Sequence, residues 1–499
     1  MTTTLLVRRF VDEYLRNRAN LVLLVLVPVV FVVVAAPALA EAGRVLGGAG
    51  GGAPLATITA GWTAGFLAAT AMYFQVSAAR MTDRRLVISG LPRRTLVTAR
   101  MSAGAVLAFV AGVAALIALA ARNGIDQPWR VVAGTLMFAA IYLGFGAIVG
   151  ATVRNPVNGT VLLMFIWIID VFFGPGMSGA DSPVIRALPT HFVSLWTVNL
   201  PPGHGGASEL VWSLVWTGAA LVGAFLVVLQ TTSVGRRRRA AQVGSAAAQL
   251  RSGLRMAWRG WHRTPVLWAL LAVVPAVFIW LADAITPHGS APVGLRENGT
   301  ALTAMLDPAH MHAGTMAPIA VGSLAAIAGV FIGLDARNAD QRLALAGQRR
   351  WVVLATRLGT VFLAAGVATA ASLAVTATVF EAHQWGVYIA ANALVAMTYA
   401  LIGVVIGPII GRVSGAFVAF LIPFIDLGIG QSPMLQAQPE GWAEYLPGYG
   451  SVRVLLDGAL TDTFDETRSL LLALAWVAAL ALAAIMLFRH ERASTPASA

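Results

Sequence analysis

The chain has 499 residues, of which 58% are hydrophobic and 11% are charged, and its mean hydropathy is +0.77. A soluble domain carries about 25% charged residues, so this composition indicates a polytopic membrane protein. All 34 basic residues are arginine and no cysteine is present, which excludes an ATP-binding P-loop with its essential lysine, as well as disulfides and thiolate metal sites.

The net charge of +12 would suggest a nucleic-acid partner in a soluble protein. Here the arginines lie in short loops between apolar segments, where membrane topology explains them better. No nucleic-acid partner is therefore expected.

Residues 4–18 predict an amphipathic helix lying on the membrane surface. Leu6, Phe10 and Tyr14 recur every four residues, and the charged residues between them face elsewhere. The apolar segment 20–40 that follows ends near a small-residue sequence with a weak resemblance to a signal-peptide cleavage site. A cleaved signal is the alternative, but a polytopic chain favours a retained first span.

Six segments of the first half are apolar enough to cross the ~30 Å hydrocarbon core of a bilayer, which takes about 20 residues. They are 20–40, 58–79, 101–121, 131–152, 157–173 and 210–230. The fifth is short, and it leads into a loop of roughly 35 residues that contains Leu188-Pro189.

A basic connector joins the two halves. Residues 232–249 include four consecutive arginines, Arg236 to Arg239, followed by a small-residue linker. The arginines after this linker recur at i+4 spacing and leave an apolar face, which predicts a second interfacial helix like the first. These arginines are Arg251, Arg255, Arg259 and Arg263.

The second half repeats the first. Its six segments are 265–285, 315–334, 358–380, 386–410, 415–430 and 469–488. The short eleventh segment also precedes a loop of roughly 35 residues, and Asp170 matches Asp426 at an offset of 256. The predicted fold is an all-α polytopic membrane protein with twelve transmembrane helices in two parallel six-helix repeats. The expected boundaries are 1–231 for the first repeat, 232–249 for the linker and 250–499 for the second repeat.

The arginines also predict the orientation. Seven of them lie in one set of loops: Arg44, Arg122, Arg130, Arg186, Arg296, Arg453 and Arg468. The other 27 lie on the opposite side, which is therefore predicted to be cytoplasmic and holds both termini.

The most specific pattern is DRRLVISGLPRRTLVTAR, Asp83 to Arg100, which returns as DQRLALAGQRRWVVLATR, Asp340 to Arg357. Each copy lies on the predicted cytoplasmic side between the second and third spans of its half. We expect Asp83 to Arg94 to form a short helix parallel to the membrane, ended by Gly90 and Pro92. An ordinary positive-inside loop would explain one copy, whereas two copies with the same spacing favour a docking element. The candidate docking residues are Asp83, Arg84, Arg85, Gly90, Arg93, Arg94, Asp340, Arg342, Gly347, Arg349 and Arg350.

Asp170 and Asp426 form a second matched pair, each inside a short span. A carboxylate at the centre of a membrane helix costs about 2.5–3.5 kcal/mol and usually faces a cavity or the bundle interior. One interpretation is a substrate path, with Phe165, Trp167 and Phe424 as its apolar lining. The other is a structural hydrogen bond to a neighbouring helix. Weaker path candidates are Tyr73, Phe74 and Gln75.

No catalytic or metal site is expected in this chain. His310 and His312 form a His-x-His pair near Asp307, but no further ligand is evident. No Ser/His/Asp set has the spacing of a catalytic motif. The chain is therefore not expected to be an enzyme by itself, and no cofactor is expected in it.

These features resemble the ABC-2 type permeases, the membrane subunits of ATP-driven exporters. In that family each six-helix unit begins with an interfacial elbow helix and carries a coupling helix between spans two and three. A short fifth span then precedes an external re-entrant segment. The two-unit form is similar to the permeases of tetronasin-type antibiotic and multidrug exporters. One departure concerns the Glu-rich ERE-x-G-T pattern common in that family's coupling segments, where Arg84, Arg85 and Asp340-Gln341 stand here.

The resemblance implies a bacterial cytoplasmic-membrane exporter of hydrophobic or amphipathic compounds such as antibiotics or drugs. A separate ATPase, in two copies per chain, would hold ATP and Mg and dock on the two cytoplasmic patches. Which residues of the ATPase they would pair with stays open.

Two other classes of protein are alternatives to this assignment. A proton-coupled secondary transporter has the same six-plus-six layout, but its loop after span two carries Gly-x-x-x-Asp-Arg-x-Gly-Arg-Arg. Ala79 and Leu86 stand at the two glycine positions of that motif. A membrane enzyme acting on lipid or polyprenyl substrates would need clustered polar catalytic groups at one membrane face, which the sequence lacks.

Overall fold

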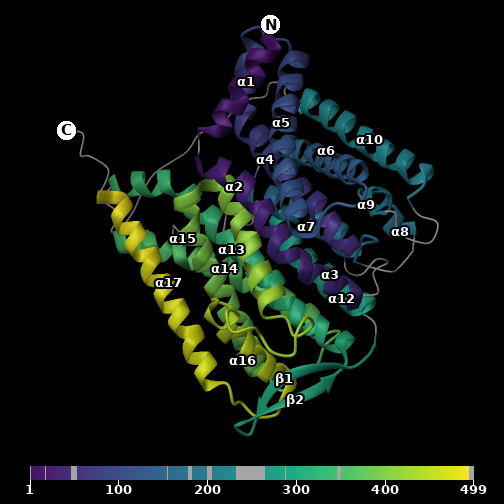
Figure 1. Cartoon of the computed structure of the whole chain (residues 1–499). Helices are drawn as coiled ribbons and strands as arrows, with labels where there is room; N and C mark the ends of the chain where they lie inside the picture. The colour runs from purple at the N-terminus through teal and green to yellow at the C-terminus, as the bar shows by residue number, and fades with distance from the viewer. Residues whose placement is uncertain are drawn as a thin grey trace. The chain divides into compact units, whose positions relative to one another are not determined.

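The computed structural model describes residues 2–16, 18–45, 53–153, 155–177, 183–198, 205–231, 265–286, 288–345 and 350–493. The chain divides into two compact units, Met1–Arg237 (unit 1) and Arg238–Ala499 (unit 2). Helices build nearly all of the described part of both units (Figure 1).

All regular elements in the described part of unit 1 are helices. They are α1 (Thr2–Leu15), α2 (Arg18–Val30), the π-turn η1 (Phe31–Ala35), α3 (Ala36–Val45), α4 (Ala53–Ile88), α5 (Arg93–Asn123), α6 (Pro128–Thr152), α7 (Pro156–Phe173), α8 (Pro183–Arg186), α9 (His191–Val198) and α10 (Ala207–Thr231). The predicted N-terminal helix is confirmed as α1. Its apolar side chain Phe10 packs on Leu96 and Ala99 of α5, so this face meets protein rather than lipid.

Unit 2 adds a small sheet to its helices. Its elements are α12 (Pro265–Ile285), β1 (Ala291–Glu297), β2 (Thr300–Leu306), α13 (Pro308–Leu345), α14 (Arg350–Thr376), α15 (Trp385–Ile425), the π-turn η2 (Asp426–Gly430), the 3₁₀ turn η3 (Ala443–Tyr445), α16 (Tyr449–Leu460) and α17 (Thr467–Ala493). The predicted second interfacial helix, 250–263, lies outside the described residues.

The antiparallel hairpin β1–β2 departs from the all-α prediction. Its ladder pairs Ala291 with Leu306 at one end and Glu297 with Thr300 at the other. Asn298 and Gly299, the two turn residues, both have positive φ, 50° and 75°. Asn-Gly is the preferred pair for such a two-residue turn, so this signal was present in the sequence.

The chain is a multi-pass helical membrane protein by helix length and hydropathy. In the described residues ten helices are long and apolar enough to cross a bilayer, and a shorter apolar helix covers Leu271–Ala284. One of the ten, Trp385–Gly430, contains both segments that were expected as spans at 386–410 and 415–430. The two parts meet at a kink at Gly411, whose φ of 81° is outside the helical region.

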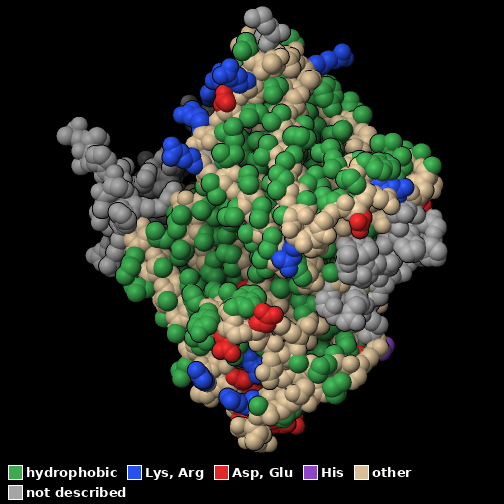
Figure 2. All heavy atoms as spheres, viewed as in Figure 1, with side chains coloured by type: hydrophobic (Ala, Val, Ile, Leu, Met, Phe, Trp, Pro, Cys, Tyr) green, Lys and Arg blue, Asp and Glu red, His purple; other side chains and the backbone are tan. Residues whose placement is uncertain are grey.

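Charged side chains gather at the ends of these helices. In Figure 2, hydrophobic side chains cover much of the visible helical surface of each unit. Blue arginines gather over α1 in unit 1, and red and blue side chains gather over the hairpin end of unit 2. This separation of apolar and charged surface is typical of helices that cross a bilayer.

The same close helix contact occurs in both units. Gly146 and Gly150 of α6 form a Gly-x-x-x-Gly motif, and added Cβ atoms there would collide with backbone atoms of Ala69 and Tyr73 on α4. In unit 2, Gly403 and Gly407 of α15 meet Ala326 and Val330 of α13 in the same way. Small residues at this spacing let membrane helices approach closely, and that approach stabilises the pair.

We expect Gly146→Ala to destabilise unit 1 by about 1–3 kcal/mol, the usual cost of overpacking. The new methyl group would collide with the carbonyl oxygen of Ala69, which is backbone and cannot rotate away. Gly218→Ala on α10 is the matched control, because a Cβ there meets nothing within 4 Å. The midpoint of SDS-induced unfolding in mixed micelles measures both. Equal midpoints for the two variants would contradict this account of the α4–α6 contact.

Candidate functional site

The first arginine-rich patch, 83–94, is the end of a long helix followed by a tight turn. The predicted separate helix from Asp83 to Arg94 is wrong, because α4 continues without a break to Ile88. No residue before Gly90 interrupts the helical hydrogen bonds. The helix then closes with Leu91 N donating to Leu86 O at 3.0 Å and Gly90 N donating to Val87 O at 3.1 Å. This Schellman pattern needs a residue with positive φ, and Gly90 has a φ of 101°.

A buried ion pair fixes this turn to the next helix. Arg100 of α5 donates to Asp83 of α4 from Nε at 3.1 Å and from its NH2 group at 2.7 Å. The guanidinium also lies over the ring of Phe10, 3.6 Å from its centroid. Three segments, α1, α4 and α5, therefore meet at one arginine. We call this set, Phe10, Asp83 and Arg100, the junction.

The other arginines of the patch point away from the junction. Arg85, Arg93 and Arg94 are exposed, and Arg84 is half-buried, with a long 3.5 Å hydrogen bond to the carbonyl of Thr231. Ile88 beside them is 67% exposed. We call this outward surface (Arg84, Arg85, Ile88, Gly90, Arg93 and Arg94) the arginine turn. Asp83 does not belong to it, because its carboxylate is buried in the junction.

The second patch is described only in part. Gly347 and Arg349 lie outside the described residues, and the side chains of Asp340, Arg342 and Arg350 are likewise not described. The helix α13 continues through Asp340 to Leu345, as α4 does through Asp83. In this copy too, the start of the patch is part of the preceding span helix.

The buried carboxylate of Asp170 in unit 1 accepts three hydrogen bonds. Its Oδ2 accepts from the Tyr142 hydroxyl of α6 at 2.6 Å and from the Thr190 hydroxyl at 2.6 Å. Its Oδ1 accepts from the backbone N–H of Thr190 at 3.2 Å. Thr190 immediately precedes α9, so the carboxylate joins α6, α7 and the start of α9. An acidic group is favourable at a helix N-terminus.

Asp426 has the corresponding partners in unit 2. Its Oδ2 accepts from the Tyr399 hydroxyl at 2.5 Å and from the backbone N–H of Gly448 at 2.8 Å. Gln431 donates to its Oδ1 at 3.4 Å. Gly448 immediately precedes α16, as Thr190 precedes α9. We call the two sets the Tyr–Asp clamps.

Each clamp holds a carboxylate that is 2% exposed. Of the two interpretations that the sequence allowed, a hydrogen bond to a neighbouring helix describes these contacts. The aromatic residues also pack: Trp167 donates to the Trp62 carbonyl at 2.8 Å, and Phe424 stacks on Phe420. Phe165 is half-buried. A substrate path along these residues stays a prediction.

The tyrosines of the clamps were missed in the sequence. Tyr142 and Tyr399 match at an offset of 257, and each stands four residues before a contact glycine, Gly146 or Gly403. This matched Tyr-x-x-x-Gly pair was the available signal. The tyrosines lie 28 and 27 positions before the aspartates that they contact. No local sequence pattern therefore predicts these two hydrogen bonds.

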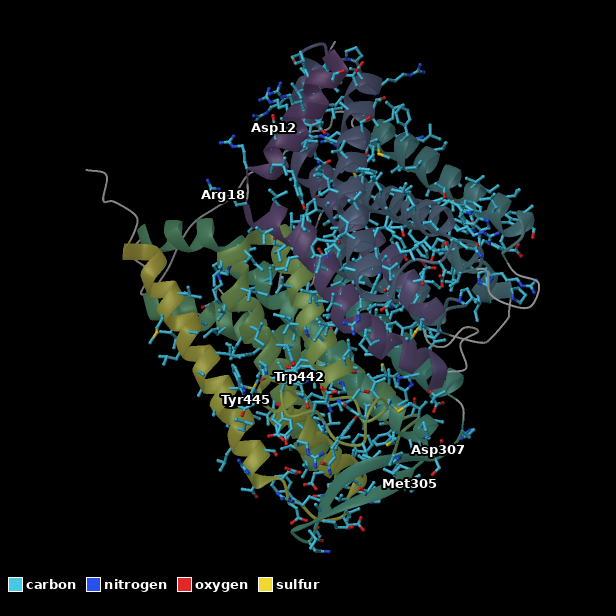
Figure 3. The ribbon with its side chains drawn as sticks, viewed as in Figure 1. Asp12, Arg18, Met305, Asp307, Trp442 and Tyr445 are labelled. Carbon is cyan, nitrogen blue, oxygen red and sulfur yellow. The ribbon has the colours of Figure 1, made fainter. Side chains whose placement is uncertain are left out.

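Two histidines near the hairpin of unit 2, His288 and His312, have hydrogen-bond partners other than a shared metal. His288 Nδ1 lies 2.7 Å from Asp307, which Figure 3 shows beside the hairpin. The hydrogen bond to this carboxylate raises the pKa of His288. His312 pairs with Thr286 at 2.6 Å. Over the described parts of the chain, no group of three or more His, Asp or Glu side chains could hold a metal ion.

The fold and these sites define a multi-pass helical membrane protein with a braced arginine turn and two Tyr–Asp clamps. Comparison with protein-family models and with curated proteins gives no match.

Proposed function

We propose that this chain is the membrane subunit of an ATP-driven exporter of the ABC-2 type. In this proposal it has twelve spans in two parallel six-span repeats, with the arginine-rich ends in the cytosol. The cargo is a hydrophobic or amphipathic compound, such as an antibiotic or drug, and the resemblance to antibiotic and multidrug exporters supports this substrate class.

The junction is the observation that carries the proposal. A surface that transmits force from a motor must be connected rigidly to the helices that it moves. Arg100 connects the elbow helix α1, the second-span helix α4 and the third-span helix α5 directly beneath the arginine turn. A simple topology signal would need exposed arginines but no buried brace. The brace therefore supports a mechanical role for this turn.

The ATPase is a separate protein in this proposal, because the chain lacks lysine and hence a P-loop. Two ATPase copies would hold ATP and Mg, dock beneath the two patches and dimerise on ATP. Exposed arginines favour a partner surface rich in carboxylates, through complementary charge. Movement of the patches would then tilt the span helices between inward-open and outward-open arrangements. The clamps would keep α9 and α16 attached to their spans during this motion.

Arg93→Glu combined with Arg350→Glu is expected to uncouple ATP hydrolysis from transport. Charge reversal at both patches would oppose a carboxylate-rich partner, while membrane insertion stays unchanged. The measurement is ATPase stimulation and transport by the chain reconstituted in vesicles with its partner ATPase. Arg9→Glu on α1 is the control, because Arg9 is exposed but lies outside the arginine turn. Coupled transport at the wild-type level in the double variant would reduce these loops to topology signals.

A second measurement separates the proposal from a proton-coupled secondary transporter. An ATP-driven exporter stops when ATP is depleted, even if a proton gradient is maintained. If no ATPase co-purifies, and transport continues on the proton gradient alone, the exporter proposal fails.

A further inference from the structure

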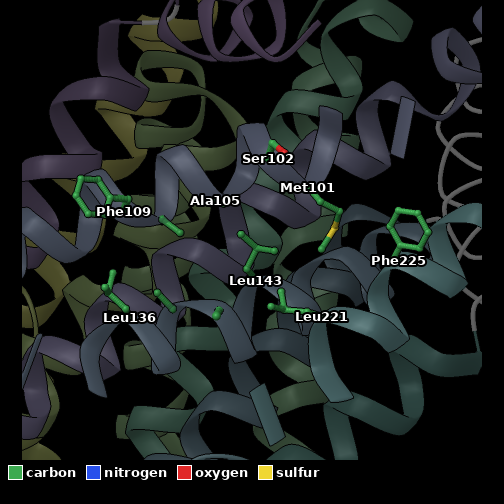
Figure 4. Close-up of a pocket in the computed structure, with 11 residues that line it drawn as sticks. Met101, Ser102, Ala105, Phe109, Leu136, Leu143, Leu221 and Phe225 are labelled. Atoms are coloured by element: carbon green, nitrogen blue, oxygen red, sulfur yellow. The ribbon is translucent and has the colours of Figure 1, made fainter. Parts of the chain in front are cut away.

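An apolar pocket lies in unit 1 between α5, α6 and α10 (Figure 4). Its volume is about 470 Å³, within the range of roughly 300–1,000 Å³ of small-ligand sites. Ten of its eleven lining residues are apolar, and Ser102 supplies a hydroxyl. Figure 4 shows Phe109, Leu136, Leu143 and Phe225 around it. Such a lining suits a hydrocarbon chain and offers little to a polar ligand.

The pocket lies at the depth of lipid tails. From Ser102 to Phe109, α5 rises about 10 Å at 1.5 Å per residue, starting near the helix end predicted to be cytoplasmic. One leaflet contributes about half of the ~30 Å hydrocarbon core, so the α5 side of the pocket falls within that leaflet. Its rim is open to the side, because Phe109 is 56% exposed and Ala105 is exposed too. In a bilayer this opening faces acyl chains.

A positive charge continues the same helix face toward the membrane surface. Arg94, Thr98, Ser102, Ala105 and Phe109 follow one another at steps of three or four residues, so they share one face of α5. Arg94 and Thr98 are exposed. The distance along the axis from Arg94 to Ser102 is about 12 Å. An apolar pocket with an arginine nearer the membrane surface matches the two parts of an anionic lipid, its acyl chain and its charged headgroup.

We infer that this pocket holds one acyl chain of an anionic glycerophospholipid from the leaflet predicted to be cytoplasmic, with the lipid phosphate at Arg94. Arginines near the cytoplasmic surface attract anionic lipids. The bound chain fills space between α5, α6 and α10 that the protein leaves open. Lipid binding can be measured without the ATPase or the cargo, although Arg94 also belongs to the arginine turn on which the ATPase is proposed to dock.

The test uses the full chain purified in detergent without an ATPase. Phosphatidylglycerol and phosphatidylcholine with the same acyl chains are added in turn, and bound lipid is counted by native mass spectrometry. We expect one tightly retained phosphatidylglycerol, held about fivefold more strongly than phosphatidylcholine, the preference that one arginine at the membrane surface provides. Ala105→Trp should abolish this retention by filling the pocket. Ala120→Trp is the matched control, an exposed alanine on the same helix that does not line the pocket.

A second pair of variants tests the headgroup. Arg94→Gln should remove the preference for phosphatidylglycerol, whereas Arg122→Gln at the other end of α5 should keep it. If Ala105→Trp does not fold, Ala105→Leu replaces it with a smaller obstruction. Equal lipid retention by the Ala105 and Ala120 variants would overturn the site. Equal binding of the two lipids would overturn the assignment of an anionic headgroup, and displacement by a transported drug would make the pocket a cargo site instead.

Discussion

Asp83→Ala is expected to destabilise unit 1 by about 3–5 kcal/mol, the usual cost of removing one partner from a buried ion pair. The variant leaves the Arg100 guanidinium buried, with the Phe10 ring beside it but without its carboxylate. The neutral ring cannot replace two charged hydrogen bonds. The loss should appear as a lower midpoint of SDS-induced unfolding in mixed micelles.

Two controls separate the ion pair from general damage at this turn. Arg84→Ala should change the midpoint little, because its hydrogen bond to Thr231 is exposed and 3.5 Å long. Asp83→Leu with Arg100→Leu should recover most of the stability, since apolar side chains often replace a buried pair at no net cost. If Asp83→Ala unfolds at the same midpoint as Arg84→Ala, the junction does not brace the turn.

Asp170→Ala is expected to destabilise unit 1 by at least about 3 kcal/mol, because each buried donor left without an acceptor costs about 1–3 kcal/mol. The hydroxyls of Tyr142 and Thr190 and the N–H of Thr190 would all lose their acceptor. Tyr142→Phe removes one donor and keeps the others satisfied, so its cost should be about 1 kcal/mol. Unfolding midpoints of the two variants give the comparison.

The clamps also separate the two roles proposed for these aspartates. Asp170→Asn with Asp426→Asn keeps an acceptor oxygen at each site but removes the negative charge. Selective loss of cationic cargo with normal expression would support a substrate path. Reduced expression or stability without a change in cargo selectivity would show that the carboxylates act as structural acceptors.

The positions of the long helices were predictable from the sequence. Each expected span falls on a helix, although two of them join into Trp385–Gly430. The apolar sequence on both sides of Gly411 predicted helix there, and the structure has helix on both sides of this kink. Whether the two parts cross the membrane separately stays a prediction, because hydropathy does not report a backbone angle. The hairpin β1–β2 was missed for another reason. Its Asn298-Gly299 turn signal is short and stood within a chain dominated by helical apolar segments.

The sequence predicted the position of the candidate site but not the contacts of its charged residues. The matched arginines marked the turn at Gly90, and a glycine is needed there because the backbone has positive φ. Yet Asp83 was grouped with the exposed arginines, and it is instead buried against Arg100. Asp83 and Arg100 both occur in the repeated pattern. Their spacing in the sequence could not show whether they bind each other or face a partner protein.

The sequence by itself determined that the chain crosses a membrane many times and that segments of its two halves match, whereas the concentration of arginines on one side of the spans stays a prediction. These are properties of local composition and order, and hydropathy or an alignment of the two halves is enough to read them. Only the tertiary structure decided which charges face outward and which are used inside. Arg100 meets Phe10, and Asp170 meets Tyr142 and Thr190, because helix packing brings together residues that lie 20 to 90 positions apart. Burial then makes those contacts strong, since an unpaired charge or donor is costly where water is excluded.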